Sequence, residues 1–111
     1  MRLDGRHAVV TGGGGAIGRA IAARLSAAGA AVLVADRDGE AAERAAAAIP
    51  GAASLALDVT DEEACIALPA EAARRIGGFD ALVHAAGIGI ERAFLETTRA
   101  EWERMLATNL T

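Results

Sequence analysis

The chain has 111 residues, enough for one small domain but too few for a second, substrate-binding domain. Hydrophobic residues make up 53% and charged residues 23%, a balance that excludes disorder and predicts a packed core. The net charge of −4 and the aromatic content of 3% argue against nucleic-acid binding, which needs a basic face and stacking side chains.

No apolar run reaches the roughly 18 to 20 residues that a membrane span requires, and the first residues contain no apolar signal-peptide core. The single cysteine, Cys65, excludes an internal disulfide. His7 and His84 lie too far apart in sequence to indicate a metal site. We therefore expect a cytoplasmic, metal-free protein that binds neither a nucleic acid nor a membrane.

Short apolar runs alternate with longer helical patterns along the chain. The expected strands are residues 8–10, 31–35, 55–57 and 81–83, and the expected helices are residues 17–28, 40–49 and 61–76, with a fourth helix from residue 99. Because the strands are nearly unbroken apolar runs, both faces of the sheet should be covered, as in a parallel α/β sheet. The pattern predicts a doubly wound α/β sheet of about four strands in the order 3-2-1-4, with helices on both faces.

Local signals add detail to these elements. The buried stripe of the first helix is predicted by three apolar residues spaced four apart: Ile17, Ile21 and Leu25. Thr60 and Glu63 have the spacing of a capping box and predict the start of the third helix, which Pro69 should kink or split. In the order 3-2-1-4, residues 81–83 form a sheet edge that nothing pairs.

A glycine-rich loop separates the first expected strand from the first expected helix. Residues 11–18 read Thr-Gly-Gly-Gly-Gly-Ala-Ile-Gly and contain glycine-x-glycine-x-x-glycine at Gly13, Gly15 and Gly18. Backbone N–H groups approach a pyrophosphate closely where side chains are absent, and the following helix N-terminus adds partial positive charge. The loop predicts a dinucleotide site, and the alternative is a turn that only lets the strand and helix pack. The chain has no lysine, which excludes a Walker-type phosphate loop.

An acidic residue, Asp36, ends the second expected strand about 20 residues after the loop, as dinucleotide-binding units require. Its carboxylate can accept hydrogen bonds from the adenosine ribose and would repel a 2′-phosphate, which favours NAD over NADP. Arg37 follows and is able to pair with such a phosphate, so NADP stays the less favoured alternative. Together with the sheet pattern, these residues predict a Rossmann-type fold.

In the order of its motifs, the whole chain resembles the short-chain dehydrogenase/reductase family. Residues 11–18 resemble the family's Thr-Gly-x-x-x-Gly-x-Gly cofactor loop, with Ala16 in place of the middle glycine. The resemblance implies an NAD(P)-dependent oxidoreductase that interconverts an alcohol and a ketone on a small molecule. It also implies that loop residues contact the cofactor: Gly12, Gly14, Gly15, Ile17 and Gly18.

Two further segments match family motifs and imply more cofactor-binding residues. Asp58 and Val59 resemble the pair that meets the adenine, and the alternative is a simple turn at a strand end. His84, Ala86 and Gly87 lie where the family has Asn-Asn-Ala-Gly or Asn-Ala-Ala-Gly, along the path from the adenosine ribose to the nicotinamide. His84 departs from that pattern, and without a partner acid we expect a structural, hydrogen-bonded side chain rather than a catalytic one.

Asn109 is the one catalytic residue that the resemblance carries over. It matches an asparagine that helps to hold a catalytic water, and the alternative is an asparagine that is favoured near a helix end. The family's catalytic tyrosine and lysine have no counterpart because the chain contains neither residue. Its only serines, Ser26 and Ser54, fall in the first helix and near the third strand, so the substrate-polarising serine is missing too.

We therefore interpret residues 1–111 as an NAD(P)-binding Rossmann half-domain, truncated within its fourth helix and inactive on its own. The parent chain would be an oxidoreductase acting on a small alcohol or ketone, and the resemblance implies a homodimer or homotetramer. Two alternatives stay open: a stand-alone module that binds an adenine dinucleotide without chemistry, and an inactive remnant.

Overall fold

The computed structural model describes residues 2–85 and the backbone of residues 95–98. Strands and helices alternate along the first of these ranges, in the order β1 (His7–Thr11), α1 (Ala16–Ala27), β2 (Ala31–Asp36), α2 (Gly39–Ala47), β3 (Ala53–Ala56), α3 (Glu62–Ile76) and β4 (Ala81–His84), and β5 (Leu95–Thr98) follows. The predicted boundaries of the first seven elements agree with these within two residues. Within the described ranges, no helix combines the length and the apolar character that a membrane crossing demands.

The strands form one sheet in the order β3-β2-β1-β4-β5. The first four are parallel, and Thr11 of β1 pairs with Ala35 of β2 on one side and His84 of β4 on the other. The predicted parallel order 3-2-1-4 is therefore confirmed. Because parallel strands all end at the same edge, the segments that follow β1, β2, β3 and β4 meet at the carboxyl edge of the sheet.

The expectation that β4 is an unpaired edge is wrong. β5 pairs antiparallel with β4, with Ala81 opposite Thr98 and His84 opposite Leu95. The apolar pattern that revealed the other strands has no counterpart here, because Leu95–Thr98 has one apolar residue in four. Short strands with a charged residue are typical of sheet edges, where they limit pairing with other chains.

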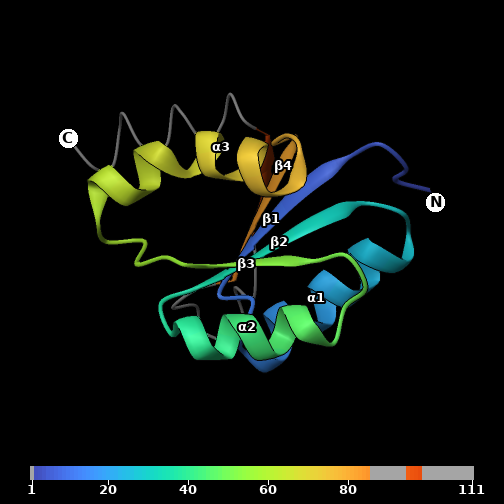
Figure 1. The fold of residues 1–111 in the computed structure, drawn as a ribbon, viewed down its shortest axis with the longest axis horizontal. Coiled ribbons are helices and arrows are strands. Elements are labelled where there is room, and N and C mark those ends of the chain that lie inside the picture. The colour runs from blue at the N-terminus through green and yellow to red at the C-terminus, as the bar shows by residue number, and fades with distance from the viewer. Residues whose placement is uncertain (1, 86–94, 99–111) are drawn as a thin grey trace.

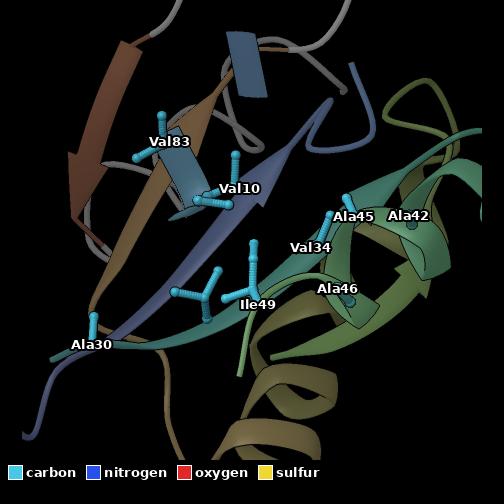
Figure 2. Close-up of a cluster of buried hydrophobic side chains, with 10 residues drawn as sticks. Val10, Ala30, Val34, Ala42, Ala45, Ala46, Ile49 and Val83 are labelled. Atoms are coloured by element: carbon cyan, nitrogen blue, oxygen red, sulfur yellow. The ribbon is translucent and has the colours of Figure 1, made fainter. Parts of the chain in front are cut away.

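Helices cover both faces of the sheet, with α1 and α2 on one side and α3 on the other (Figure 1). The core on the α1/α2 side includes Val10, Val34 and Val83 from the strands and Ala42, Ala45, Ala46 and Ile49 from α2 and the turn after it (Figure 2). The core on the α3 side includes Val9, Leu33, Leu68, Ala72 and Leu82. Successive strand residues serve opposite cores, which explains why the strand sequences are apolar without interruption.

The buried face of α1 differs from the predicted stripe. Gly18 and Ala22 are its buried residues, whereas Ile17 is 46% exposed. The other two predicted residues, Ile21 and Leu25, are partly buried against the α1/α2 core. Small residues form the contact because α1 lies so close to β1 that a Cβ on Gly18 would collide with the backbone of Gly12.

α3 begins one residue later than the capping box predicts. The N-cap is Asp61, whose carboxylate accepts a hydrogen bond from the N–H of Ala64, whereas the Thr60 hydroxyl donates to Asp58. A carboxylate is the stronger acceptor for a helix N-terminal amide, which accounts for the difference. The predicted split at Pro69 is also wrong, because the helix is continuous through it and stays packed through buried residues such as Leu68.

Candidate functional site

A cleft of about 460 Å³ opens at the carboxyl edge of the sheet. Its lining comes from the segments that follow all four parallel strands: Gly12, Gly15, Asp36, Arg37, Leu57, Asp58, Val59, Thr60 and Ala85. Open parallel sheets bind their ligands at this edge. Five of the predicted cofactor-binding residues are thus brought together in one cleft: Gly12, Gly15, Asp36, Asp58 and Val59. Arg37, which the sequence analysis named as a possible partner of a 2′-phosphate, lines it as well.

The glycine loop is held in place by its own amides. Three successive N–H groups donate within the protein: Gly13 to the carbonyl of Ala35 (3.0 Å), Gly14 to Oδ2 of Asp36 (2.9 Å) and Gly15 to the carbonyl of Gly12 (3.2 Å). The first helical N–H to bond within α1 is that of Arg19, which donates to Gly15. The amides without an intrahelical acceptor are therefore those of residues 16–18, in the first turn of α1.

Close packing explains most, but not all, of the glycines in this loop. A Cβ on Gly14 would lie 2.7 Å from the Cβ of Ala41 on α2, and one on Gly18 would strike the backbone of Gly12. A Cβ on Gly15 would meet nothing closer than 3.5 Å. The packing alternative therefore accounts for Gly14 and Gly18 but leaves Gly15, which borders the cleft, without a steric reason.

The N-terminus of α1 is suited to an anion. Its N-cap, Gly15, provides no side-chain hydrogen bond, and the first turn contains no acidic residue. The helix dipole and the three amides of residues 16–18 therefore present uncompensated partial positive charge beside the cleft.

Asp36 is held at both carboxylate oxygens. Oδ2 accepts the N–H of Gly14 and Oδ1 accepts the N–H of Asp38, each at 2.9 Å. The side chain is partly buried and lines the cleft beside Arg37. Each oxygen of a carboxylate accepts more than one hydrogen bond, so Asp36 can hold the loop and still accept from a ligand hydroxyl.

Asp58 serves the turn that follows β3. Its Oδ1 accepts from the hydroxyl of Thr60 at 2.6 Å and from the N–H of Thr60 at 2.9 Å. These two hydrogen bonds, followed by the charge of Arg37, hold the pKa of Asp58 below its ordinary value of 3.8. Asp58 is therefore ionised at neutral pH and has the strand-end role that the sequence analysis left open. Its contact with an adenine ring stays a prediction.

His84 forms the hydrogen bond that was expected of it. Its Nδ1 lies 2.7 Å from Oγ1 of Thr11, on the neighbouring strand β1. Thr11 is 1% exposed and His84 is half-buried, and this burial lowers the pKa of His84 from its ordinary value of 6.5. A contact between His84 and a cofactor stays a prediction.

Cys65 lies beneath the cleft wall. The thiol of this buried side chain donates to the carbonyl of Val59 at 3.4 Å. Burial raises its pKa, and the charges of Asp61 and Asp58 add to the effect, so the thiol is a poor nucleophile at neutral pH. In the part of the chain that the structure describes, no group of three histidine, cysteine or acidic residues could hold a metal ion.

Three predicted site residues, Ala86, Gly87 and Asn109, lie outside the described residues. Three cleft residues were missed by the sequence analysis: Leu57, Thr60 and Ala85. Each lies within a few positions of the end of a parallel strand, and that position along the chain is the signal that could have identified them.

Known proteins resemble this chain in sequence and in fold. Residues 6–111 match the family model of the short chain dehydrogenases. The chain belongs to the short-chain dehydrogenase family.

The curated relatives that this chain resembles are longer than the chain itself. It is 36% identical to the meso-2,3-butanediol dehydrogenase of Serratia marcescens and 41% identical to the sorbitol dehydrogenase of Cereibacter sphaeroides. Each alignment covers 99% of this chain but only 45% and 43% of the respective relative, so the chain spans less than half of their length. Among solved structures, a 3-ketoacyl-(acyl-carrier-protein) reductase from Brucella melitensis in complex with NADH is 35% identical, with a TM-score of 0.66 over 70% of this chain and 32% of that chain.

Proposed function

We propose that the chain is the dinucleotide-binding half of an NAD-dependent short-chain dehydrogenase that interconverts an alcohol and a ketone on a small molecule. The observation that carries the proposal is the cleft itself, which combines an uncapped helix N-terminus with a carboxylate that is fixed at both oxygens. An adenine dinucleotide needs this pair, because its pyrophosphate is an anion and its adenosine ribose offers hydroxyl donors.

The residues of the cleft have distinct roles in this proposal. The amides of residues 16–18 bind the pyrophosphate, and Gly12 and Gly15 leave room for it. Asp36 accepts the hydroxyls of the adenosine ribose, and Asp58 and Val59 lie against the adenine. The three predicted residues outside the described ranges keep their proposed roles: Ala86 and Gly87 on the path to the nicotinamide, and Asn109 beside a catalytic water.

The bound cofactor supplies the hydride chemistry, and the rest of the dehydrogenase supplies proton transfer and the substrate pocket. The 111 residues contain no tyrosine and no lysine, so we expect them to catalyse no turnover alone. The homodimer or homotetramer implied for the parent chain is part of the same proposal.

Isothermal titration with NAD, NADP and ADP-ribose tests the binding site. We choose Asp36→Asn over an alanine variant because the one amide oxygen of asparagine can still accept the N–H of Gly14, although the charge and the hydrogen bond from the N–H of Asp38 are lost. We expect NAD to bind more tightly than NADP, and Asp36→Asn to weaken NAD binding by about tenfold and to narrow that preference.

Asp38→Asn is the matched control. It removes the same charge two residues away, keeps the cap of α2, and affects a side chain that does not line the cleft. We expect it to leave both affinities unchanged. A folded chain that binds none of the three nucleotides would contradict the proposal, and equal effects of the two variants would contradict the role of Asp36.

A stand-alone binding module would give the same titration results as half of a dehydrogenase. A second measurement is therefore needed to distinguish these two possibilities. The intact mass of the protein made from its natural gene should exceed twice that of the 111 residues. A mass equal to that of the 111 residues, together with nucleotide binding and no turnover, would favour the module.

A further inference from the structure

The pair formed by His84 and Thr11 lies directly beneath the glycine loop. The two residues are register partners at the carboxyl ends of β4 and β1, the neighbouring central strands. Thr11 is followed by Gly12 and His84 is followed by Ala85, and both of these following residues line the cleft. The pair therefore joins two walls of the proposed dinucleotide site.

The hydrogen bond between Thr11 and His84 indicates which imidazole nitrogen carries the hydrogen. The Thr11 hydroxyl is buried, and its one side-chain partner among the described residues is Nδ1 of His84 at 2.7 Å. A buried hydroxyl hydrogen without an acceptor is unfavourable, so the hydroxyl donates and Nδ1 accepts. This arrangement requires a neutral imidazole with its hydrogen on Nε2.

Protonation of His84 would turn Nδ1 into a donor. Two donors would then face one another across the pair, and the Thr11 hydroxyl would have to rotate away from its acceptor. The backbone links the pair tightly to the loop, because the N–H of Ala85 donates to the carbonyl of Thr11 at 3.0 Å. Any displacement of Thr11 therefore reaches both walls of the cleft.

The next residue transmits the displacement to α1. Gly12 has a φ of +70°, a conformation that only glycine adopts easily, and its carbonyl accepts the N–H of Gly15. The same residue lies against Gly18 at such close range that no Cβ would fit there. A shift of Gly12 consequently moves the N-cap and the first turn of α1, whose amides form the proposed pyrophosphate site.

Several charged residues lie on the elements that surround the pair. Among the residues whose side chains the structure describes, charged groups on the elements around the pair include His7 at the far end of β1, Arg19 and Arg24 on α1, Asp36 at the end of β2, Arg37 after it and Asp58 after β3. Asp36 and Asp58 are engaged by backbone and side-chain donors of their own turns. Burial is the cause that lowers the pKa of His84.

We propose that His84 is a positioning residue for the glycine loop and that its protonation weakens dinucleotide binding. The inference rests on the proposed function, since it concerns the affinity of that same cleft. Nucleotide binding by this dehydrogenase chain would then weaken in mild acid, through a residue where the family pattern has asparagine.

The test is the dissociation constant of ADP-ribose between about pH 5 and about pH 8, the range in which histidine titrates. ADP-ribose is the probe because it contains the adenosine and pyrophosphate that the described residues would contact. We expect the constant of the wild-type chain to rise by about tenfold as His84 becomes protonated, below pH 6.5. The His84→Asn variant, which cannot titrate, should show a constant that does not change over this range.

Three further variants separate the pair from other causes. His7→Asn removes the other histidine and should keep the full pH dependence. Thr11→Ser keeps the hydroxyl and should also keep the pH dependence of binding. Thr11→Val removes the hydroxyl and should abolish the pH dependence. Circular dichroism over the same range confirms that each variant stays folded.

Histidine resonances in NMR spectra provide a readout independent of affinity. By linkage, bound ADP-ribose should lower the pKa of His84 in the wild-type chain and in Thr11→Ser. Nucleotide binding that is equally pH-dependent in His84→Asn, or that strengthens when His84 is protonated, would overturn the inference while leaving the proposed function intact. Absence of ADP-ribose binding at every pH would instead contradict the proposed function.

Discussion

The three described helices begin in two different ways. α2 and α3 start after aspartates whose carboxylates accept backbone amides, Asp38 for α2 and Asp61 for α3, and both have acidic residues in their first turns. α1 starts after Gly15 with neither a side-chain cap nor an acid. The N-termini of α2 and α3 are thus capped by carboxylates of the chain itself. The N-terminus of α1, which borders the cleft, has no such carboxylate and can accept an anionic ligand. The difference locates the proposed site more sharply than the glycine count does.

The largest expected effect comes from breaking the contact that places the α1 N-terminus. In Gly18→Ala the new Cβ would collide with the backbone of Gly12, which cannot move aside cheaply. We expect a loss of about 3 kcal/mol in the free energy of unfolding, measured by urea denaturation. Gly15→Ala is the matched control, because its Cβ meets nothing closer than 3.5 Å, and it should lose less than about 1 kcal/mol. Similar losses of unfolding free energy in the two variants would contradict the conclusion that close packing against Gly12 requires a glycine at position 18.

The next effect makes α1 resemble the other two helices. Gly15→Asp would place a capping carboxylate at the α1 N-terminus, where a Cβ fits. We expect the free energy of unfolding to rise by a few tenths to about 1 kcal/mol, because the new carboxylate accepts an amide and interacts with the helix dipole. The affinity for ADP-ribose, measured by calorimetry, should fall by about tenfold or more. Gly15→Asn separates the effect of the cap from that of the charge. It should stabilise the helix about as much as Gly15→Asp does, but should weaken ADP-ribose binding less.

A smaller effect is expected where a cap is removed from a helix that has one. Asp61→Ala deletes the acceptor of the Ala64 amide and should lower the free energy of unfolding by about 1 kcal/mol in urea denaturation. Asp61→Asn keeps an acceptor oxygen and should stay close to the wild type. Affinity for ADP-ribose should change little in either variant, because Asp61 does not line the cleft. A large change in affinity would mean that the α3 start belongs to the site.

The smallest effect concerns the opposite edge of the sheet, where another carboxylate accepts a backbone amide. Oδ2 of Asp80 accepts the N–H of His7 and lies 2.8 Å from its Nδ1. The side-chain hydrogen bond with His7 is the main cause that lowers the pKa of Asp80 from 3.8. A carboxylate with a lowered pKa in the folded state stabilises above its unfolded pKa, and this contribution is lost as the pH falls.

Asp80→Asn tests this contribution. Relative to the wild type, it should be destabilised at about pH 6 and should approach the wild type at about pH 3, as followed by urea denaturation. Glu43→Gln, at an exposed position on α2, is the control for loss of a surface charge. A stability difference that does not depend on pH would rule out the ionised carboxylate as its source.

The sheet and the position of the cleft could be predicted from the sequence because each depends on a pattern within a short segment. Four apolar runs mark the parallel strands, and Asp36 follows the glycine loop at the spacing of a dinucleotide unit. The start of α3 could not be predicted as well, since Thr60 and Asp61 are both common N-cap residues and the capping-box pattern does not account for the stronger acceptor, the carboxylate of Asp61. β5 has no apolar run, and its pairing depends on the edge that β4 presents.

The details of the site were predicted least well where side chains compete for one group. A residue pattern cannot show that the amides of Gly13, Gly14 and Gly15 are used within the protein, which moves the proposed anion contacts to residues 16–18. Nor can it show that Ile17 is exposed, because helical periodicity assumes that the largest apolar residue faces the sheet. Here α1 lies too close to β1 for a large residue, and Gly18 takes that place.

The three hydrogen bonds of the glycine loop also bear on conformational entropy. A run of four glycines is the most flexible stretch an unfolded chain can have, and its ordering is correspondingly unfavourable. Because Gly13, Gly14 and Gly15 each donate within the protein, folding of the domain already orders the loop. A nucleotide would therefore meet a rigid receptor, and little of its binding free energy would be used to immobilise the backbone.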